Sequence, residues 1–233
     1  MDGVFRRRNL PHLDVEGKPS FITACLHGSL PAAGFRRIAA YRDQLDARVK
    51  PAELSDAEWE IKKHKLIFKR VDSILDRESP VKHFTDARLA EVVQNAFLHF
   101  ADVRYKLFAY VVMPSHHHWM FLPAAKWCNE LADSQRDHPQ KRTPREVISH
   151  SVQSFTANRC NRLRRVTGSF WQVETFDHYA RDESELLRII DYIEQNPVVA
   201  GLVDKAEDYR WSSAHLRHQH GTPRGEPIRK RVV

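Results

Sequence analysis

Apolar positions along the 233-residue chain recur with two spacings, one typical of strands and one of helices. Residues 21–30 are apolar and β-branched and end before a proline, which predicts a first strand. Residues 105–113 and 116–122 are two short apolar stretches separated by a Pro-Ser dipeptide, so we expect two neighbouring strands with a tight connection. The aromatic-rich residues 170–179 predict a further extended segment.

Other segments show helical spacing. Residues 85–100 carry an apolar stripe at intervals of three and four, which predicts an amphipathic helix. Residues 34–77 are charged and helical in period. A threonine, a proline and a glutamate at the third helical position predict a capped helix over 143–165. Asp182 begins another helix, which we expect Pro197 to end.

This order of elements predicts an α+β fold: a ferredoxin-like antiparallel sheet with helices packed on one face, plus a helical insertion after the first strand. We expect one domain over residues 1–215, with the insertion at 34–80, and a polar C-terminal tail at 216–233. Residues 126–142 show no clear period and predict a polar loop.

Composition narrows the class of protein. Hydrophobic residues make up 42% and charged residues 29% of the chain, which is typical of a soluble globular protein. The chain has no long apolar run and no secretory signal, and its three cysteines lie far apart, so we expect a reduced, cytoplasmic protein with no membrane partner. The net charge of +7 favours a polyanionic partner, although many basic proteins bind nothing acidic.

The three consecutive histidines that open the 116–122 stretch are the clearest chemical feature. On a strand His116 and His118 point to one face and His117 to the other, so the outer two can reach one cation. Two alternatives remain open: polar residues at the end of a strand, or a structural zinc site completed by Cys128 or His150.

The helix that begins after Asp182 has an apolar stripe, and Tyr192 lies on its border with Asn196 one turn further along. From spacing alone such a tyrosine is usually a boundary residue whose hydroxyl faces solvent. The helix over 143–165 presents a basic face that predicts contact with a nucleic-acid backbone, or else a solvated surface. The arginines of this face are Arg159, Arg162 and Arg165. A second basic group near the N-terminus, Arg6, Arg7 and Arg8, could form an arm that reaches a DNA hairpin.

Several ordered blocks carry a resemblance to a known family. Residues 110–123, YVVMPSHHHWMFLP, resemble the histidine block of the REP-associated tyrosine transposases, which are relatives of the single-strand insertion-sequence transposases of the HUH superfamily. Residues 170–203 are similar to that family's second block, and SFTANRCNRL and RWSSA also agree with it. The resemblance runs from about residue 10 to residue 214.

The resemblance implies a function and roles for individual residues. Tyr192 corresponds to the nucleophile, and Asn196 to the polar side chain that joins His116 and His118 in holding a divalent metal, Mg²⁺ or Mn²⁺. His178 and Arg181 match an element that could support the site or contact phosphate. The activity implied is cleavage and rejoining of single-stranded DNA near hairpins or palindromes, through a 5′-phosphotyrosine intermediate.

The chain departs from the family pattern in two places. The middle histidine position is normally bulky and hydrophobic, but here it is His117, which needs a hydrogen-bond partner if it is buried. The insertion exceeds the minimal catalytic domain, and regulation, dimerisation and DNA binding are open roles for it, so a homodimer is one expected assembly. A hairpin-binding repressor whose catalysis has lapsed remains the alternative function.

Overall fold

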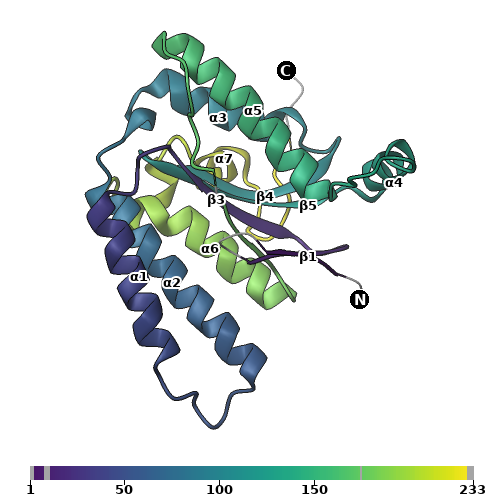
Figure 1. Ribbon diagram of the computed structural model, residues 1–233. Helices are drawn as coiled ribbons and strands as arrows, with labels where there is room; N and C mark the ends of the chain where they lie inside the picture. The colour runs from purple at the N-terminus through teal and green to yellow at the C-terminus, as the bar shows by residue number, and fades with distance from the viewer. Residues whose placement is uncertain (1–2, 8–10, 174, 230–233) are drawn as a thin grey trace.

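The structure is a computed structural model that describes residues 3–7, 11–173 and 175–229. A four-stranded antiparallel sheet has the order β4-β5-β3-β6 and lies across the middle of the molecule (Figure 1). Its strands are β3 (Ser20–Cys25), β4 (Tyr105–Val112), β5 (His116–Pro123) and β6 (Phe176–Tyr179). The hairpin of β1 (Gly3–Arg7) and β2 (Pro11–Val15) forms a separate two-stranded sheet. The α+β fold with an antiparallel sheet is confirmed.

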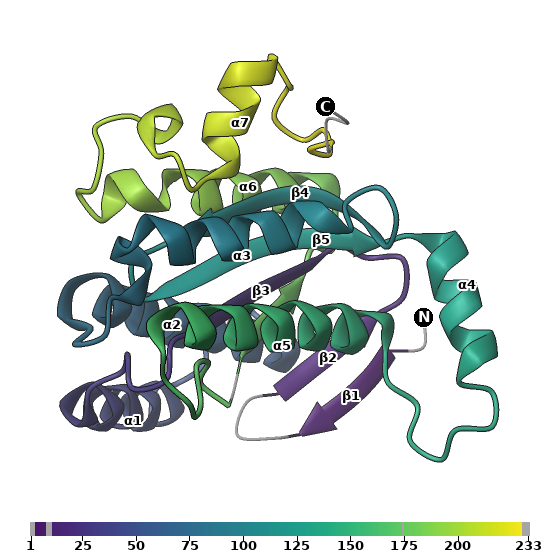
Figure 2. The ribbon, with the colours of Figure 1, turned by 90° about the horizontal axis from the view of Figure 1, so that it is seen from above.

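Helices cover both faces of the sheet, so the prediction of one covered face was wrong. Helices α3 (Ala87–His99) and α5 (Pro144–Arg164) lie on one face, and α2 (Asp56–Glu78) and α6 (Glu183–Val199) lie on the other (Figures 1 and 2). Successive side chains of β3 point to opposite faces of the sheet, so the core around the sheet consists of two clusters, one on each face. Ile22 packs in the cluster on the α3 and α5 side, whereas Phe21 packs with Ile190 of α6.

The insertion consists of two helices, α1 (Ala32–Asp46) and α2, which pack against each other and extend away from the sheet (Figure 1). Ser55 and Glu58 form the capping box that begins α2. The C-terminal half of α2 returns to the sheet and buries Phe68, Ile74 and Leu75. The insertion therefore packs on the face of the sheet that also carries α6.

Three local features differ from the sequence predictions. Helix α4 (Ala125–Ser134) occupies part of the expected loop. None of its residues is buried, so its sequence lacks the long apolar stripe by which other helices were predicted. Pro197 lies inside α6, where the chain stays helical as far as Val199. Residues of the expected polar tail form α7 (Ser213–His220) and then return to the sheet, where the Ile228 amide donates to the Leu107 carbonyl at 2.7 Å.

Helix α7 contacts α6 on the side away from α2. Arg217 of α7 forms a buried ion pair with Glu194 of α6 at 2.7 Å, and the Ser213 hydroxyl donates to the same carboxylate at 2.7 Å. The short helices η1 (His83–Thr85) and η2 (Ala206–Asp208) complete the described elements. No helix in the described part of the chain combines the length and apolar character that crossing a membrane requires.

His117 points into the core on the α3 and α5 side and is 1% exposed. Its ring packs edge-on against Phe97 and Trp171, with centroids 5.1 and 4.9 Å away. Among the described residues neither ring nitrogen has a hydrogen-bond partner, so the partner expected from the sequence is missing. Burial holds the pKa of His117 well below its ordinary value, and the ring is therefore neutral.

Replacing His117 with leucine should stabilise the protein. The change removes buried polar atoms without partners and keeps a side chain of similar volume, which we expect to add about 1–2 kcal/mol to the free energy of unfolding. For a chain of this size that corresponds to a melting temperature higher by roughly 2–8 °C, measured by circular dichroism. His218→Leu on the exposed face of α7 should leave the melting temperature unchanged. A lower melting temperature for His117→Leu would contradict the assignment.

Candidate active site

Strand β5 places two histidine side chains on the face covered by α2 and α6. His116 lies opposite Cys25 of β3, and His118 lies opposite Thr23. Both imidazoles are fully buried, and their Nε2 atoms lie 3.2 Å apart. The prediction that strand alternation brings these two rings together is therefore confirmed.

The outward ring nitrogens are held by hydroxyl groups. The Ser115 hydroxyl donates to the Leu75 carbonyl at 3.0 Å, so its oxygen accepts the hydrogen bond from His116 Nδ1 at 3.0 Å. In the neutral tautomer that this contact favours, Nδ1 of His116 carries the proton and the Nε2 lone pair is directed into the site. Thr23 Oγ1 contacts Nδ1 of His118 at 2.6 Å and holds that ring in the corresponding orientation. Such contacts orient histidine ligands in metal sites.

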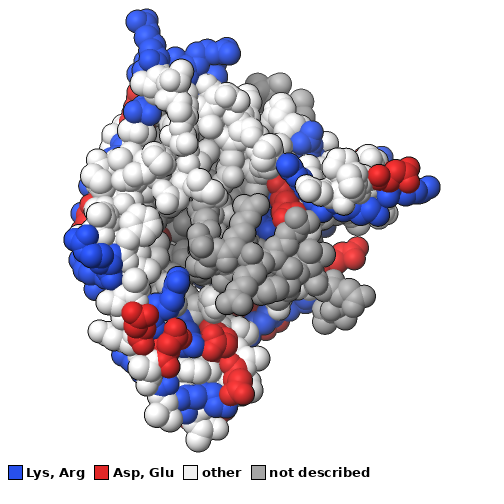
Figure 3. Space-filling view, viewed as in Figure 1, with Lys and Arg blue, Asp and Glu red and all other residues white. Residues whose placement is uncertain are grey.

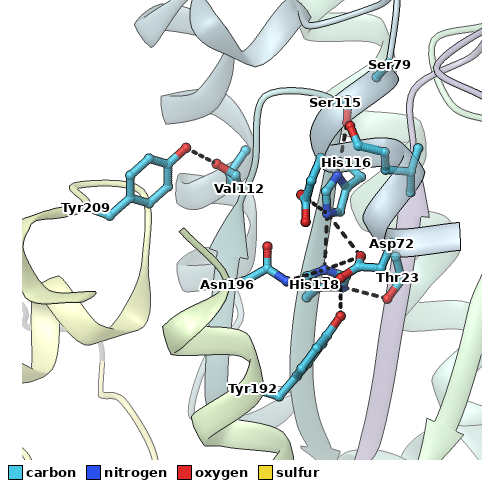
Figure 4. A network of polar contacts seen from close by, with 12 residues as sticks. Thr23, Asp72, Ser79, Val112, Ser115, His116, His118, Tyr192, Asn196 and Tyr209 are labelled. Carbon is cyan, nitrogen blue, oxygen red and sulfur yellow. Dashed lines mark hydrogen bonds and ion pairs between the residues drawn. The ribbon is translucent and has the colours of Figure 1, made fainter. Parts of the chain in front are cut away.

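Asp72 of α2 faces both histidines, and sequence reasoning missed it. Its Oδ1 lies 3.1 Å from His118 Nε2 and 3.4 Å from His116 Nε2. Among the described residues Asp72, His116 and His118 are the group whose geometry could hold a metal ion. Figure 4 shows the three side chains converging from α2 and β5.

The spacing of these atoms fits a cation. Adjacent ligands about 2.1 Å from one ion are separated by about 3 Å, close to the 3.1–3.4 Å observed here. Asp72 Oδ1 is buried and accepts no hydrogen bond from the described residues. A carboxylate oxygen and an imidazole lone pair would face each other unfavourably without a positive charge between them, so the donor set suits a divalent metal.

Helix α6 brings Tyr192 and Asn196 to the same point. The Tyr192 hydroxyl donates to Asp72 Oδ2, which also accepts from Asn196 Nδ2 at 3.2 Å. Asn196 Nδ2 lies 3.4 Å from His118 Nε2. Asn196 Oδ1 has no partner among the described residues. The oxygen and nitrogen of an amide are assigned from their contacts, and the reversed orientation would direct Oδ1 toward His118 and Asp72. Pro197 does not disturb this placement, since α6 continues past it.

The electrostatics keep the tyrosine protonated in the absence of a metal. Burial raises the pKa of Tyr192 far above its ordinary value, and the negative charge of Asp72 adds to the effect. Burial also lowers the pKa of His118, which favours the neutral imidazole that a metal ligand requires. The result is a neutral phenol hydrogen-bonded to a carboxylate that also faces His116 and His118.

Helices α2 and α6 run parallel, with matched positions in contact. Lys65 contacts Glu185 and Asp72 contacts Tyr192, and each pair is separated by 120 residues in the sequence. Between these two contacts, Phe68 packs against Tyr192 with ring centroids 5.8 Å apart. The parallel packing therefore fixes the position of Asp72 along the helix axis relative to Tyr192.

His178 of β6 and Arg181, which follows that strand, lie beside the first turn of α6 and away from His116, His118 and Asp72. Both contact the buried carboxylate of Glu185, at 3.2 Å for His178 Nε2 and 2.7 Å for Arg181 Nε, and Lys65 reaches it at 2.8 Å. Glu185 precedes Tyr192 by seven residues, about 10 Å along a helix axis. The structure thus gives these two residues a role in fixing the start of α6, and contact with phosphate remains a proposal.

The basic residues of α5 lie on the opposite face of the sheet from the site. Arg159, Arg162 and Arg165 are exposed, and Lys and Arg side chains project beyond the end of α5 at the upper left of Figure 3. Arg8 lies outside the described residues, as do the side chains of Arg6 and Arg7 in β1. Binding of DNA by all six arginines remains a proposal.

The structural zinc site expected as an alternative does not form with the predicted ligands. Cys128 lies on α4, and His150 lies on α5 across the sheet, and neither belongs to the metal-binding group found among the described residues. The third residue of that group is instead Asp72, a buried charge on the apolar stripe of α2. That misplaced charge was the signal in the sequence, because a buried aspartate needs a partner.

Comparisons with known proteins bear on the fold and on a segment of the sequence. No family model matches the chain. A segment of 55 residues is 36% identical to a Haemophilus influenzae protein provisionally named a REP-associated tyrosine transposase, and it spans 24% of this chain and 31% of that relative. A solved structure of a REP-associated tyrosine transposase bound to a REP hairpin superimposes with a TM-score of 0.51 and 15% identity, over 94% of this chain and 89% of that one. The resemblance to the REP-associated tyrosine transposases is thus confirmed in a segment of the sequence and in the fold.

Proposed function

We propose that this protein is a metal-dependent enzyme that cleaves and rejoins single-stranded DNA near hairpins through a 5′-phosphotyrosine intermediate. One observation carries the proposal: a tyrosine hydroxyl, a carboxylate, two imidazoles and an amide from three separate elements converge on one point (Figure 4). A buried tyrosine beside a group of metal ligands suits nucleophilic attack on a phosphodiester better than it suits a structural role.

His116, His118 and Asp72 would hold the divalent ion, with Asn196 as a further ligand. When bound, Mg²⁺ or Mn²⁺ would polarise the scissile phosphate and stabilise the charge that develops on the departing 3′ oxygen. The hydroxyl contacts of Ser115 and Thr23 keep both imidazoles oriented for this role.

Tyr192 is the nucleophile in this mechanism. Its Oη attacks phosphorus, an Oη–P bond forms, and the P–O3′ bond breaks. The phenolic proton passes to Asp72 Oδ2, which already accepts the hydrogen bond. The departing 3′ oxygen takes up a proton from solvent. Because the new phosphotyrosine retains the energy of the phosphodiester, a 3′-OH can reverse the step and join DNA strands.

The choice of a hairpin as substrate rests on the structural neighbour, which is a complex with a REP hairpin. The net charge of +7 suits a phosphate backbone. We propose that Arg159 and Arg162 of α5, with Arg165 at its C-cap, bind the hairpin on the face of the sheet opposite Tyr192. The single-stranded flank would then cross an edge of the sheet to reach the site.

The test is formation of a covalent protein–DNA adduct. Incubation of the full chain with Mn²⁺ and a labelled single strand that bears a hairpin should give a band of reduced mobility that survives denaturation. A chelator added beforehand should remove at least nine-tenths of the adduct, and added Mn²⁺ should restore it. Hairpin binding with no adduct in Mg²⁺ or Mn²⁺ would instead support the repressor whose catalysis has lapsed.

A further inference from the structure

A second carboxylate of α2 lies beside the metal ligands. Asp76 follows Asp72 by one helical turn, and its Oδ1 is 3.8 Å from His116 Nε2. Its side chain is only 8% exposed, and Oδ1 has no hydrogen-bond partner among the described residues. A buried oxygen that faces the ligands of a metal site is a candidate ligand itself.

His116 and Arg77 interact favourably with the charge of Asp76, but the other surroundings of this carboxylate disfavour it. Asp76 lies in the last turn of α2, where the helix dipole disfavours a negative charge. It also lies one turn from Asp72, and like charges at this spacing repel each other. Three unfavourable terms, burial, dipole and like charge, coincide at one side chain. A divalent cation between the two aspartates and the histidines would offset all three.

The number of oxygen ligands bears on the choice of metal. One carboxylate and two imidazoles are a set that zinc or ferrous iron also accepts. Asn196 and Asp76 would add two oxygens, and a site with more oxygen ligands and higher coordination suits Mn²⁺ or Mg²⁺. Asp76 Oδ1 approaches His116 Nε2 at 3.8 Å, within the span of about 3–4 Å between ligands of one octahedral ion, but it lies outside the group whose ligand atoms are all within 4.8 Å of one another. A rotation of the Asp76 side chain toward Asp72 and His118 would bring it to the ion.

We propose that Asp76 is an additional carboxylate ligand that makes the site prefer Mn²⁺ or Mg²⁺ over Zn²⁺. This inference rests on the metal-dependent function proposed above. It also assigns the helical insertion a place in the active site, because α2 supplies both carboxylates to the histidines of β5.

The experiment measures metal binding to the full chain without DNA. Calorimetry and the electron paramagnetic resonance signal of free Mn²⁺ give the Kd for Mn²⁺, and competition with a chromogenic chelator gives that for Zn²⁺. Asp76→Asn should weaken Mn²⁺ binding by about 10- to 100-fold and Zn²⁺ binding by less than about 3-fold. Asp76→Glu, which keeps the charge, should retain the preference for Mn²⁺.

Glu78→Gln is the matched control. Glu78 follows Asp76 by two residues, but its side chain is exposed and pairs with Arg37, so the substitution removes an equal charge outside the site. It should leave both dissociation constants unchanged. An unchanged Kd for Mn²⁺ in Asp76→Asn, or an equal loss for both metals, would overturn the proposal. If Asp76→Asn does not fold by circular dichroism, Asp76→Glu decides, because loss of the Mn²⁺ preference there would also overturn it. A protein that binds Mn²⁺ in this way but forms no DNA adduct would count against the proposed function alone.

Discussion

Tyr192→Phe should abolish the covalent adduct with DNA, leaving less than about one-thousandth of the wild-type yield. The substitution removes the single oxygen that can form the bond to phosphorus and keeps the ring, which packs between Phe68 and His118 at 5.8 and 5.6 Å. The metal ligands are untouched, so Mn²⁺ affinity should change by less than about 3-fold. The yield is measured by denaturing electrophoresis of the labelled strand after incubation with Mn²⁺.

Tyr209→Phe is the control for this substitution. The Tyr209 hydroxyl donates to the Val112 carbonyl at 2.9 Å, so this variant also loses a hydrogen-bonding hydroxyl close to the same part of the sheet (Figure 4). It should form adduct at close to the wild-type level. A Tyr192→Phe protein that forms adduct as the wild type does would exclude Tyr192 as the nucleophile, whereas loss in both variants would indicate a structural defect.

The histidine pair could be predicted from sequence because it depends on local geometry. Alternation along one strand is enough to place His116 and His118 together, whatever the strand packs against. The capping boxes at Ser55 and Thr143 are local in the same sense, and both form as expected. Tyr192 and Asn196 lie one turn apart on one helix, so their common direction was predictable too.

Asp72 could not be found in this way because its role depends on tertiary packing. It precedes His116 by 44 residues and lies on a helix that resembled an appendage in the sequence. The second covered face of the sheet had a visible signal that the one-face prediction ignored. Every residue of β3, and almost every residue of β4, is buried, and such continuous burial requires helices on both sides.

Asp72→Asn should have the second largest effect, because Asp72 serves two parts of the site. Its Oδ1 faces the histidines and its Oδ2 accepts from Tyr192. Losing the charge should weaken Mn²⁺ binding by on the order of 100-fold. At Mn²⁺ concentrations that saturate the variant, the rate of adduct formation should still be lower by about 100-fold, because the proton acceptor of the tyrosine is lost.

Comparing the rate at low and saturating Mn²⁺ separates these two roles. Asp191→Asn is the control, since Asp191 adjoins Tyr192 on α6 but is half-exposed and pairs with Arg224 at 2.8 Å. It should leave both metal affinity and rate unchanged. Full recovery of Asp72→Asn at saturating Mn²⁺ would limit Asp72 to holding the metal and exclude it as the acceptor of the Tyr192 proton. Unchanged affinity for Mn²⁺ would exclude Asp72 as a ligand.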